Sequence, residues 1–480
     1  MEYELVIGIE IHAQLSTQTK LFCSCPNNFG DIPNQNTCPV CLAHPGTLPV
    51  INRTAVEKTV KAGIAFHCEI NSFSRFARKN YFYPDLPKGY QISQYESPVC
   101  SNGYFEIKGS DGLPKRIRLR RIHIEEDAGK LMHETVKSGS LVDLNRAGTP
   151  LMEMVTEPDF SSADEVYDFL VRLRRILRYL NVCDGNMEEG SMRCEPNISI
   201  RPKGSTQLGT KIELKNINSF KAAKRGIEFE FRRQILCLDM GEKLCQETRG
   251  WDDNKGESFL MRTKEDAHDY RYFPDPDLQP LRIPESLIKQ ISETMEELPD
   301  ARKDRLVKVY GLSENDVEVL CSEKTHAEYF EKTAERCNDP KLAANWVMGE
   351  VLRVLKNDSN LESFPIQPDR LGMLVSLIKQ GKISGTIAKK VFELMLKNPD
   401  SPEKIVSERG LSVVGDDDSI LKVVQEIIAE FPDQITQYLS GKEKVFGFLI
   451  GNAMKKMKGK ADPAKLNQMM KDEIEKKKNM

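Results

Sequence analysis

Gly8-Ile9-Glu10-Ile11-His12 is the stretch that decides the fold of this 480-residue chain. Side chains alternate between the two faces of a β-strand, so we expect Ile9 and Ile11 to face a core while Glu10 and His12 share the opposite surface. Three further stretches alternate acids with aliphatics in the same way: His123-Ile124-Glu125, Glu195-Pro196-Asn197-Ile198-Ser199-Ile200 and Lys211-Ile212-Glu213-Leu214-Lys215. The sequence therefore predicts a sheet with one apolar and one acidic face.

The acidic face predicts an enzyme site for hard cations and phosphate, because magnesium prefers oxygen ligands and needs only a few carboxylates. The candidate magnesium ligands are Glu10, His12, Glu125, Glu195 and Glu213. The candidate catalytic residues are Glu10, His12, Glu125 and Glu213. Any one of these acids is also explained as a surface charge or as the partner of a nearby Lys or Arg. The agreement of four strands favours a site.

Basic and aromatic residues alternate in two segments that suit the binding of phosphates and of a stacked base. The candidate residues in these segments are Arg78, Lys79, Tyr81, Lys88 and Arg271, and Lys215 of the fourth acidic stretch is a further candidate. A packed aromatic loop is the alternative interpretation of these segments. The chain has no glycine-rich phosphate loop, so an ATP site would depend on metals and scattered side chains. It also has no Gly-X-Ser-X-Gly elbow, so ammonia for nitrogen chemistry would come from another polypeptide.

Two close cysteine pairs predict a structural zinc site. Cys23 and Cys25 are followed after a turn-rich loop by Cys38 and Cys41. Two pairs separated by a loop are typical of a closed tetrahedral thiolate site, which leaves no open position for chemistry. Four free thiols remain the alternative, and His44 is a competing ligand. The other cysteines are scattered and are expected to be small buried hydrophobes.

Composition narrows the class of protein. The formal net charge of −3 arises from nearly balanced acids and bases, so no global field indicates a nucleic-acid partner. No apolar run is long enough to span a membrane, and the acidic start does not suit a signal peptide. We therefore expect a cytoplasmic protein without disulfides. Lysines gather only near the C-terminus, where Lys455, Lys456, Lys458 and Lys460 are candidates for a polyanion contact or form a solvated helix face.

The periodicity predicts an α+β part followed by helices only. Helices are expected over residues 52–65, 162–180 and 219–239, the second with Ser162 as N-cap and Glu165 completing a capping box. Residues 1–290 would form the catalytic domain, 291–405 a helical domain and 406–480 a small helical tail. In residues 116–125, apolar side chains change from odd positions (Ile117) to even positions (Ile122). This change predicts a β-bulge near Arg120 and Arg121.

Several segments resemble the B subunits of the aspartyl/glutamyl-tRNA amidotransferases. They are residues 4–15, 78–94, 123–130, 142–150, 188–194, 214–220 and 269–277, and the tail from Lys442 through Ala461 resembles the YqeY-like module of the same family. The resemblance covers nearly the whole chain. It implies a cradle related to glutamine synthetase with a mixed or antiparallel sheet, then a helical domain, then a YqeY-like tRNA-binding tail.

The resemblance also implies the activity. Such a protein uses ATP and magnesium to phosphorylate Glu misacylated on tRNA(Gln), or Asp on tRNA(Asn), and ammonia from a separate amidase subunit then gives the amide. A small third subunit links the two. The family's metal ligands map to the five magnesium candidates, although many members have Asp at position 195. The basic and aromatic candidates would then bind phosphate and the tRNA 3′ end, and the tail lysines the tRNA body. Only part of the family has the four thiolates, which suits a structural zinc.

Two other classes of protein remain open from the sequence. A zinc-containing RNA-binding scaffold would bind tRNA without nucleotide turnover. A small-molecule amide ligase of the glutamine-synthetase type would phosphorylate free glutamate without tRNA, and the basic tail argues against it.

Overall fold

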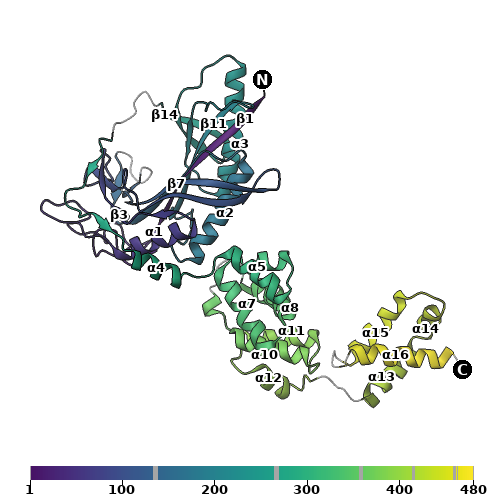
Figure 1. Ribbon diagram of the computed structural model, residues 1–480. Coiled ribbons are helices and arrows are strands. Elements are labelled where there is room, and N and C mark those ends of the chain that lie inside the picture. The colour runs from purple at the N-terminus through teal and green to yellow at the C-terminus, as the bar shows by residue number, and fades with distance from the viewer. Residues whose placement is uncertain are drawn as a thin grey trace. The chain divides into compact units, whose positions relative to one another are not determined.

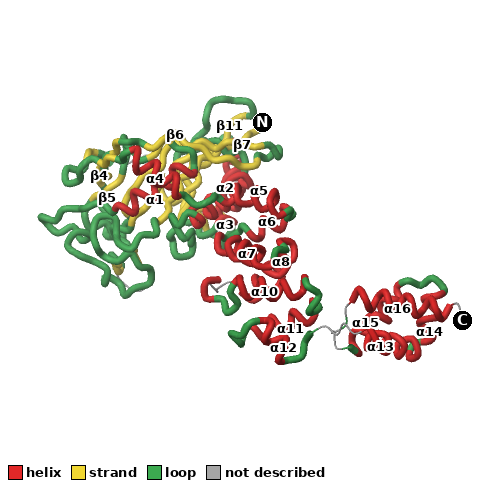
Figure 2. The backbone as a smooth tube through the Cα atoms, turned by 60° about the horizontal axis from the view of Figure 1, so that its bottom comes forward, coloured by secondary structure: helices red, strands yellow, loops and turns green. Residues whose placement is uncertain are grey.

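The structure is a computed structural model that describes residues 2–132, 139–263, 270–355, 361–412, 417–457, 461 and 463–478. Its contacts divide the chain into two compact units, Met1–Pro299 and Asp300–Met480. The first unit combines strands and helices, and the second contains only helices in its described residues (Figures 1 and 2). The predicted α+β part followed by an all-helical part is therefore confirmed.

A nine-stranded sheet organises the first unit. Its strand order is β14-β13-β12-β11-β1-β10-β7-β6-β2. The bounds are β1 (Tyr3–Gln14), β2 (Glu69–Ile70), β6 (Cys100–Lys108), β7 (Pro114–Glu126), β10 (Pro150–Thr156), β11 (Met192–Pro202), β12 (Ile212–Lys215), β13 (Glu247–Asp252) and β14 (Glu257–Thr263). Within the described residues, β12 and β13 run parallel and the other neighbours antiparallel. All four predicted acidic stretches belong to this one mixed sheet.

Three helices cover the apolar face of the sheet: α1 (Arg53–Ala65), α2 (Ala163–Tyr179) and α3 (Phe220–Asp239). Ile9, Ile11, Ile124 and Ile198 share one buried cluster with residues of these helices, such as Phe169. The alternation in each strand therefore leaves its acids on the opposite face. Burying aliphatic side chains contributes roughly 1.5–3 kcal/mol each, which fixes the register, because a shift of one residue would turn the acids into the core.

The predicted bulge lies at Arg120. The pairing of β10 with β7 runs from Val155 opposite Arg121 to Thr156 opposite Leu119, so one residue of β7 is extra. Leu119 and Ile122 are consequently both buried although they lie three positions apart. The extra residue restores the alternation and turns His123 and Glu125 toward the polar face.

The three predicted helices begin at the residues that cap them. The side chains of Asn52, Ser162 and Ser219 accept hydrogen bonds from backbone N–H groups in the first turns of α1, α2 and α3. The capping box differs in one contact. Glu165 accepts from the backbone N–H of Ser161 instead of Ser162, and it also pairs with Lys115. The N-cap half of the prediction is confirmed, and the reciprocal bond has moved by one residue.

Smaller elements complete the first unit. They are β3 (Phe73–Ser74) with β16 (Leu281–Arg282), β4 (Ala77–Asn80) with β5 (Tyr90–Ser93) and β15 (Phe273–Pro274), β8 (Lys130–Met132) with β9 (Leu141–Asp143), and α4 (Glu285–Thr294). The sheet of β15, β4 and β5 joins two segments that are nearly 200 residues apart in sequence. The two predicted basic and aromatic segments are therefore neighbours in the fold.

The second unit contains two apolar clusters. The first is built by α5 (Pro299–Tyr310), α6 (Glu314–Leu320), α7 (Lys324–Cys337), α8 (Pro340–Trp346), a π-helix (Val347–Val351), α9 (Leu352–Leu355), a 3₁₀ turn (Leu361–Ser363), α10 (Pro368–Lys379), α11 (Gly385–Met395) and α12 (Pro402–Glu408). The second is built by α13 (Asp417–Glu430), α14 (Pro432–Leu439), α15 (Lys444–Lys456) and α16 (Pro463–Lys478). None of the described helices combines the length and hydropathy needed to cross a bilayer.

Candidate active site

One cluster on the polar face joins His12 of β1, Glu125 of β7 and Glu153 of β10. The Nε2 atom of His12 lies 3.6 Å from a carboxylate oxygen of Glu125 and 3.4 Å from one of Glu153. His123, which also belongs to β7, approaches the same two carboxylates at 3.7 and 3.4 Å. One ligand atom from each of His12, Glu125 and Glu153 lies within 4.8 Å of the others, as a shared cation requires.

Opposite charges hold this cluster in its ionised form. Burial lowers the pKa of His12, but hydrogen bonding to Glu153 and the charges of nearby acids outweigh it and raise the pKa to about 9. Burial raises the pKa of Glu153, yet His123 and His12 hold it well below its ordinary value. The same balance lowers the pKa of Glu125. These acids are therefore available as anionic ligands at neutral pH.

A second cluster contains Glu10, Glu195 and Glu213, and one oxygen of each lies within 4.8 Å of the others. Glu10 of β1 lies directly opposite Glu195 of β11. The Lys215 Nζ atom lies 2.9 Å from Glu195 and 3.4 Å from Glu213. Burial and the charges of Glu153 and Glu195 raise the pKa of Glu10. The two clusters are adjacent, because Glu10 and His12 are separated by one residue on the same face, about 7 Å along the strand.

Lys79 of β4 faces the first cluster. Burial lowers its pKa, but the charges of Glu125, Tyr272 and Glu153 outweigh burial and raise it. Its Nζ atom lies 4.9 Å from the centroid of the Tyr270 ring and 5.9 Å from that of Tyr81. The structure thus places Lys79 near the acids and beside Tyr81, and the role of both residues in binding phosphate or the tRNA 3′ end stays a prediction.

Other predicted phosphate-binding residues already have carboxylate partners. Arg78 pairs with Asp275 and Asp277, at 2.8 Å in each case. The Lys88 Nζ atom lies 2.6 Å from the buried carboxylate of Glu126. Arg271 adopts a positive φ of 43° in the segment that precedes β15. The ion pairs indicate that Arg78 and Lys88 stabilise the fold. A role of Arg78, Lys88 and Arg271 in binding phosphate or tRNA stays a prediction.

A cleft of about 1520 Å³ opens beside the second cluster. Glu195 and Lys215 form part of its wall. The other charged residues of the wall are the cationic Lys130, Arg146 and Arg193 and the acidic Asp31, Asp143, Asp184, Glu188 and Glu189. The loop between the two cysteine pairs contributes another part of the wall, including Asn27 and Phe29. Buried Asp127 fixes two of the cations, because Arg193 contacts it at 2.9 Å and Arg146 at 3.7 Å.

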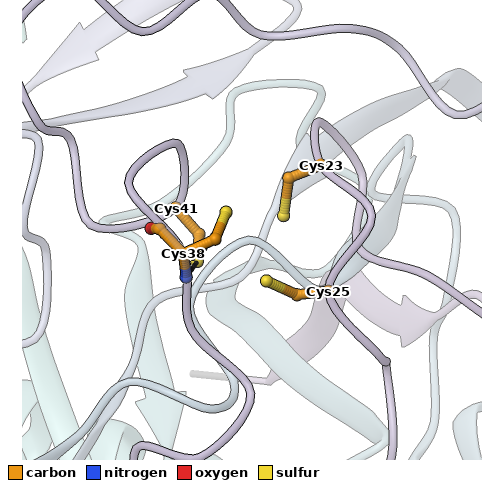
Figure 3. A group of neighbouring side chains, drawn as sticks. All are labelled: Cys23, Cys25, Cys38 and Cys41. Atoms are coloured by element: carbon orange, nitrogen blue, oxygen red, sulfur yellow. Dashed lines mark hydrogen bonds between the residues drawn. The ribbon is translucent and has the colours of Figure 1, made fainter.

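The four predicted thiolates gather at one point. The Sγ atoms of Cys23, Cys25, Cys38 and Cys41 all lie within 4.8 Å of one another and point toward a common centre (Figure 3). Tetrahedral zinc–thiolate bonds of about 2.3 Å would require sulfur atoms about 3.8 Å apart, and Cys38 and Cys41 are 3.9 Å apart. A hydrogen bond from Cys23 lowers the pKa of Cys41 to about 4, while burial raises the pKa of Cys25 to about 11. His44 is not a member of this group.

Lys20 is a buried neighbour of the thiolates. Its side chain is fully buried, and the Nζ atom lies 3.7 Å from the Cys41 sulfur and 3.2 Å from the carbonyl oxygen of Leu144. A fully buried lysine requires a compensating charge. Within the described part of the chain, no carboxylate forms an ion pair with it, so the sulfur cluster is the nearest source of negative charge.

The tail lysines are described only in part. Lys455 and Lys456 end α15, and Lys456 pairs with Glu426 and Glu430 of α13 at 3.0 and 3.1 Å. Lys455 is exposed. Lys458 and Lys460 lie outside the described residues. The role of these four lysines in binding the tRNA body stays a prediction.

Sequence reasoning missed Glu153 and His123. Glu153 is the one acid in the run Leu151-Met-Glu-Met-Val155. That run is typical of a strand buried on both faces, and a single acid within it was the available signal. His123 belongs to a predicted strand but was not among the candidate site residues, although it shares the face of Glu125.

Known proteins match the chain over nearly its whole length. The family model for the GatB/GatE catalytic domain matches residues 5–289, and that for the GatB domain matches residues 328–474. The chain is 51% identical over 477 residues to the B subunit of the aspartyl/glutamyl-tRNA(Asn/Gln) amidotransferase of Caldanaerobacter subterraneus subsp. tengcongensis, covering 99% of this chain and 100% of that protein. The chain belongs to the family of amidotransferase B subunits.

A second relative supports the same membership. The corresponding B subunit of Geobacter sulfurreducens is 52% identical over 474 residues, which cover 98% of this chain and 99% of that protein. The resemblance inferred from the sequence motifs is thereby confirmed. In this member of the family of amidotransferase B subunits, both acid clusters lie inside the part that the catalytic-domain model matches.

Proposed function

We propose that this chain uses ATP to activate the side-chain carboxylate of Glu misacylated on tRNA(Gln), of Asp misacylated on tRNA(Asn), or of both, and that ammonia then converts it to the amide. The observation that carries the proposal is the pair of adjacent acid clusters in a member of the family of amidotransferase B subunits, beside a cleft whose wall includes several cationic side chains. A partner amidase subunit would supply the ammonia, and a small bridging subunit would complete a heterotrimer.

Activation is needed because an unmodified carboxylate has no good leaving group. In the first step, an oxygen of the side-chain carboxylate bonds to the γ-phosphorus of ATP, the bond from that phosphorus to the β–γ bridging oxygen breaks, and ADP leaves. In the second step, the ammonia nitrogen attacks the acyl carbon. The carbon–oxygen bond to phosphate breaks, phosphate departs with its electron pair, and the nitrogen loses a proton.

The two clusters have donor sets that fit magnesium, which takes carboxylate oxygens and retains water. Glu125, Glu153 and, once it has released its proton, His12 would hold one ion, and Glu10, Glu195 and Glu213 another. When bound, magnesium supplies neutralisation of the charge on the transferring phosphoryl group. Lys79 and Lys215 lie at the edges of the clusters, where an ammonium group attracts an incoming carboxylate or phosphate.

The cleft and the tail suit tRNA. Lys130, Arg146 and Arg193 are cationic groups among the acids and bases of the cleft wall, and they would contact phosphate oxygens of the tRNA. The acylated 3′ end would enter there and reach Glu195 and Lys215. The tail lysines would bind the tRNA body. Since its proposed substrates are charged tRNAs, we assign the reaction to the cytoplasm.

The fine organisation of the chain is part of the proposal. We assign residues 1–290 to a cradle of the glutamine-synthetase kind, 291–405 to a helical domain and 406–480 to a YqeY-like tail. The separate apolar clusters of the second unit support the last division.

We further propose that the four cysteines hold a structural zinc ion. Their sulfur atoms meet at spacings that suit a tetrahedral thiolate site, and no other donor group belongs to the cluster among the described residues. The zinc would fix the loop between the cysteine pairs, which forms part of the cleft wall.

We expect Cys38→Ser to remove the metal and to loosen that loop. Purified protein should contain about one zinc per chain by elemental analysis, and the variant should contain almost none. Cys245→Ser is the matched control, because Cys245 is exposed and lies outside the cluster. Equal zinc content in both variants, or full reactivity of the four thiols in native protein, would contradict the assignment.

We expect Lys20→Met to weaken metal binding without removing it. Methionine keeps most of the length of the side chain but loses the charge beside the Cys41 sulfur. Loss of a partner that contacts a ligand costs about 10- to 100-fold in metal affinity, which competition with a chromophoric zinc chelator measures. An unchanged chelator titration would show that the Lys20 charge does not act on the cluster.

The proposed function is tested by mixing the purified complex with misacylated tRNA, ATP and glutamine, and then identifying the amino acid released from the tRNA. Formation of Gln or Asn together with ADP supports the proposal. Binding of tRNA without nucleotide turnover would favour an RNA-binding scaffold, and phosphorylation of free glutamate without tRNA would favour a small-molecule ligase.

A further inference from the structure

Arg121 is a cationic side chain on the polar face that pairs with no carboxylate in the part of the chain that the structure describes. It lies on β7, two residues before His123, on the face that carries Glu125. Its neighbours along the strand differ, since Arg118 and Arg120 make bidentate ion pairs with Asp159 and Glu157. Within the described residues, Arg121 forms no ion pair, and its buried Nε atom has no hydrogen-bond partner.

The position of Arg121 follows from the register of the sheet. Glu195 lies opposite Glu10, Glu10 opposite Val155, and Val155 opposite Arg121. Arg121 is therefore in the same cross-strand row as the second acid cluster, two strands or about 10 Å from Glu10. His12, Glu153 and His123 form the next row. The guanidinium group thus borders the first cluster and continues the row of the second.

Aromatic rings orient the guanidinium group. Its central carbon lies 5.9 Å from the centroid of the Tyr95 ring, and that ring stacks on Tyr272 at 4.5 Å with an interplanar angle of 13°. Burial raises the pKa of Tyr272 to about 12, while the charges of Lys79 and, to a smaller extent, Arg121 lower it. The cation–π contact with Tyr95 restricts the side chain, so a planar fork of donors is held beside the two acid clusters.

We propose that Arg121 binds a phosphoryl oxygen of the nucleoside triphosphate as its terminal phosphoryl group is transferred. The inference rests on the proposed function. A buried donor without a partner costs free energy unless a ligand satisfies it, and guanidinium forks match phosphate oxygens in a bidentate manner. Magnesium ions held by the acids would then bind one end of the phosphate chain, and the guanidinium group of Arg121 would bind the other end. Val155 lies between them in the row.

The test compares Arg121→Met with Arg118→Met in the complete complex. Arg118 is the matched control because it is on the same strand and is paired with Asp159 at the surface. A charge-assisted hydrogen bond contributes about 1.5–3 kcal/mol, so Arg121→Met should weaken binding of a non-hydrolysable triphosphate analogue about 10- to 150-fold. Its tRNA affinity should stay within about twofold of the wild type, and Arg118→Met should match the wild type in both assays.

Each result decides the inference. Unchanged triphosphate affinity in Arg121→Met overturns it. A loss confined to tRNA affinity also overturns it, because the phosphate bound would then belong to the tRNA backbone. If Arg121→Met melts at a lower temperature, Arg121→Lys carries the test, since it keeps the charge and should lose triphosphate affinity only in part. A wild-type complex that binds triphosphate but forms no ADP would refute the proposed function, while the affinity comparison would still decide the role of Arg121.

Discussion

Glu125→Gln should abolish the ADP formation that depends on misacylated tRNA, by at least about 1000-fold. Glutamine keeps the shape of the side chain and the contact with the Ser93 hydroxyl group, which lies 3.0 Å from Glu125. It removes the negative charge that faces His12, His123 and Lys79. The first cluster would lose an anionic ligand and hold magnesium less tightly, so the charge on the transferring phosphoryl group would be neutralised less well.

Two further measurements make this expectation specific. Glutamine hydrolysis by the partner amidase should survive at some level, which shows that the complex is assembled. Glu106→Gln, an exposed carboxylate on the neighbouring strand β6, should retain activity. Unimpaired ADP release from Glu125→Gln would remove Glu125 from the site.

Glu230→Gln should destabilise the first unit by about 3–5 kcal/mol, because it breaks a buried ion pair. Arg233 would lose its carboxylate partner, and Arg249 would keep only Glu247 among the described residues. Glu230 of α3 is fully buried. Its carboxylate lies 2.9 Å from Arg233 and 3.3 Å from Arg249 of β13, and it accepts a hydrogen bond from Ser258 of β14. The residue therefore fastens α3 to two strands at the edge of the sheet.

Fluorescence can follow this unit by itself. The chain has two tryptophans, and Trp251 belongs to the first unit while Trp346 belongs to the second. In a Trp346→Phe background, denaturant unfolding followed at Trp251 should give a lower midpoint for Glu230→Gln. Glu228→Gln, two residues earlier on the same helix and partly exposed, should change the free energy of unfolding by less than about 0.5 kcal/mol. Equal midpoints for the two variants would contradict the role of Glu230.

The sequence predicted most of what depends on alternation. The acidic strands, their buried faces, the bulge at Arg120 and three helix starts all follow from side-chain periodicity and local capping, which involve near neighbours. Glu153 was not predicted as a site residue, because the residues before and after it in the strand are apolar and the segment shows no alternation of polar and apolar side chains. Strand order was not predictable either, and only the order brings Glu153 between His12 and His123.

Long-range ion pairs were equally invisible from the sequence. Arg78 forms ion pairs with Asp275 and Asp277, which are almost 200 residues away in sequence, because β4 pairs with β15. Lys88 pairs with Glu126 at the point where β5 approaches β7. A basic residue near an aromatic run looks the same whether it will bind a ligand or a distant carboxylate, so only the fold distinguishes the two.

The extra residue in β7 limits where relatives of this protein can vary in length. Removing Arg120, or adding one residue between Leu119 and Ile122, would move every later side chain of the strand to the opposite face of the sheet. His123 and Glu125 would then be buried against the helices. The turn at Gly109–Leu113, by contrast, joins β6 to β7 at the far end of the same pair of strands. Insertions and deletions among homologues should therefore accumulate at that turn and be absent from the two residues beside the bulge.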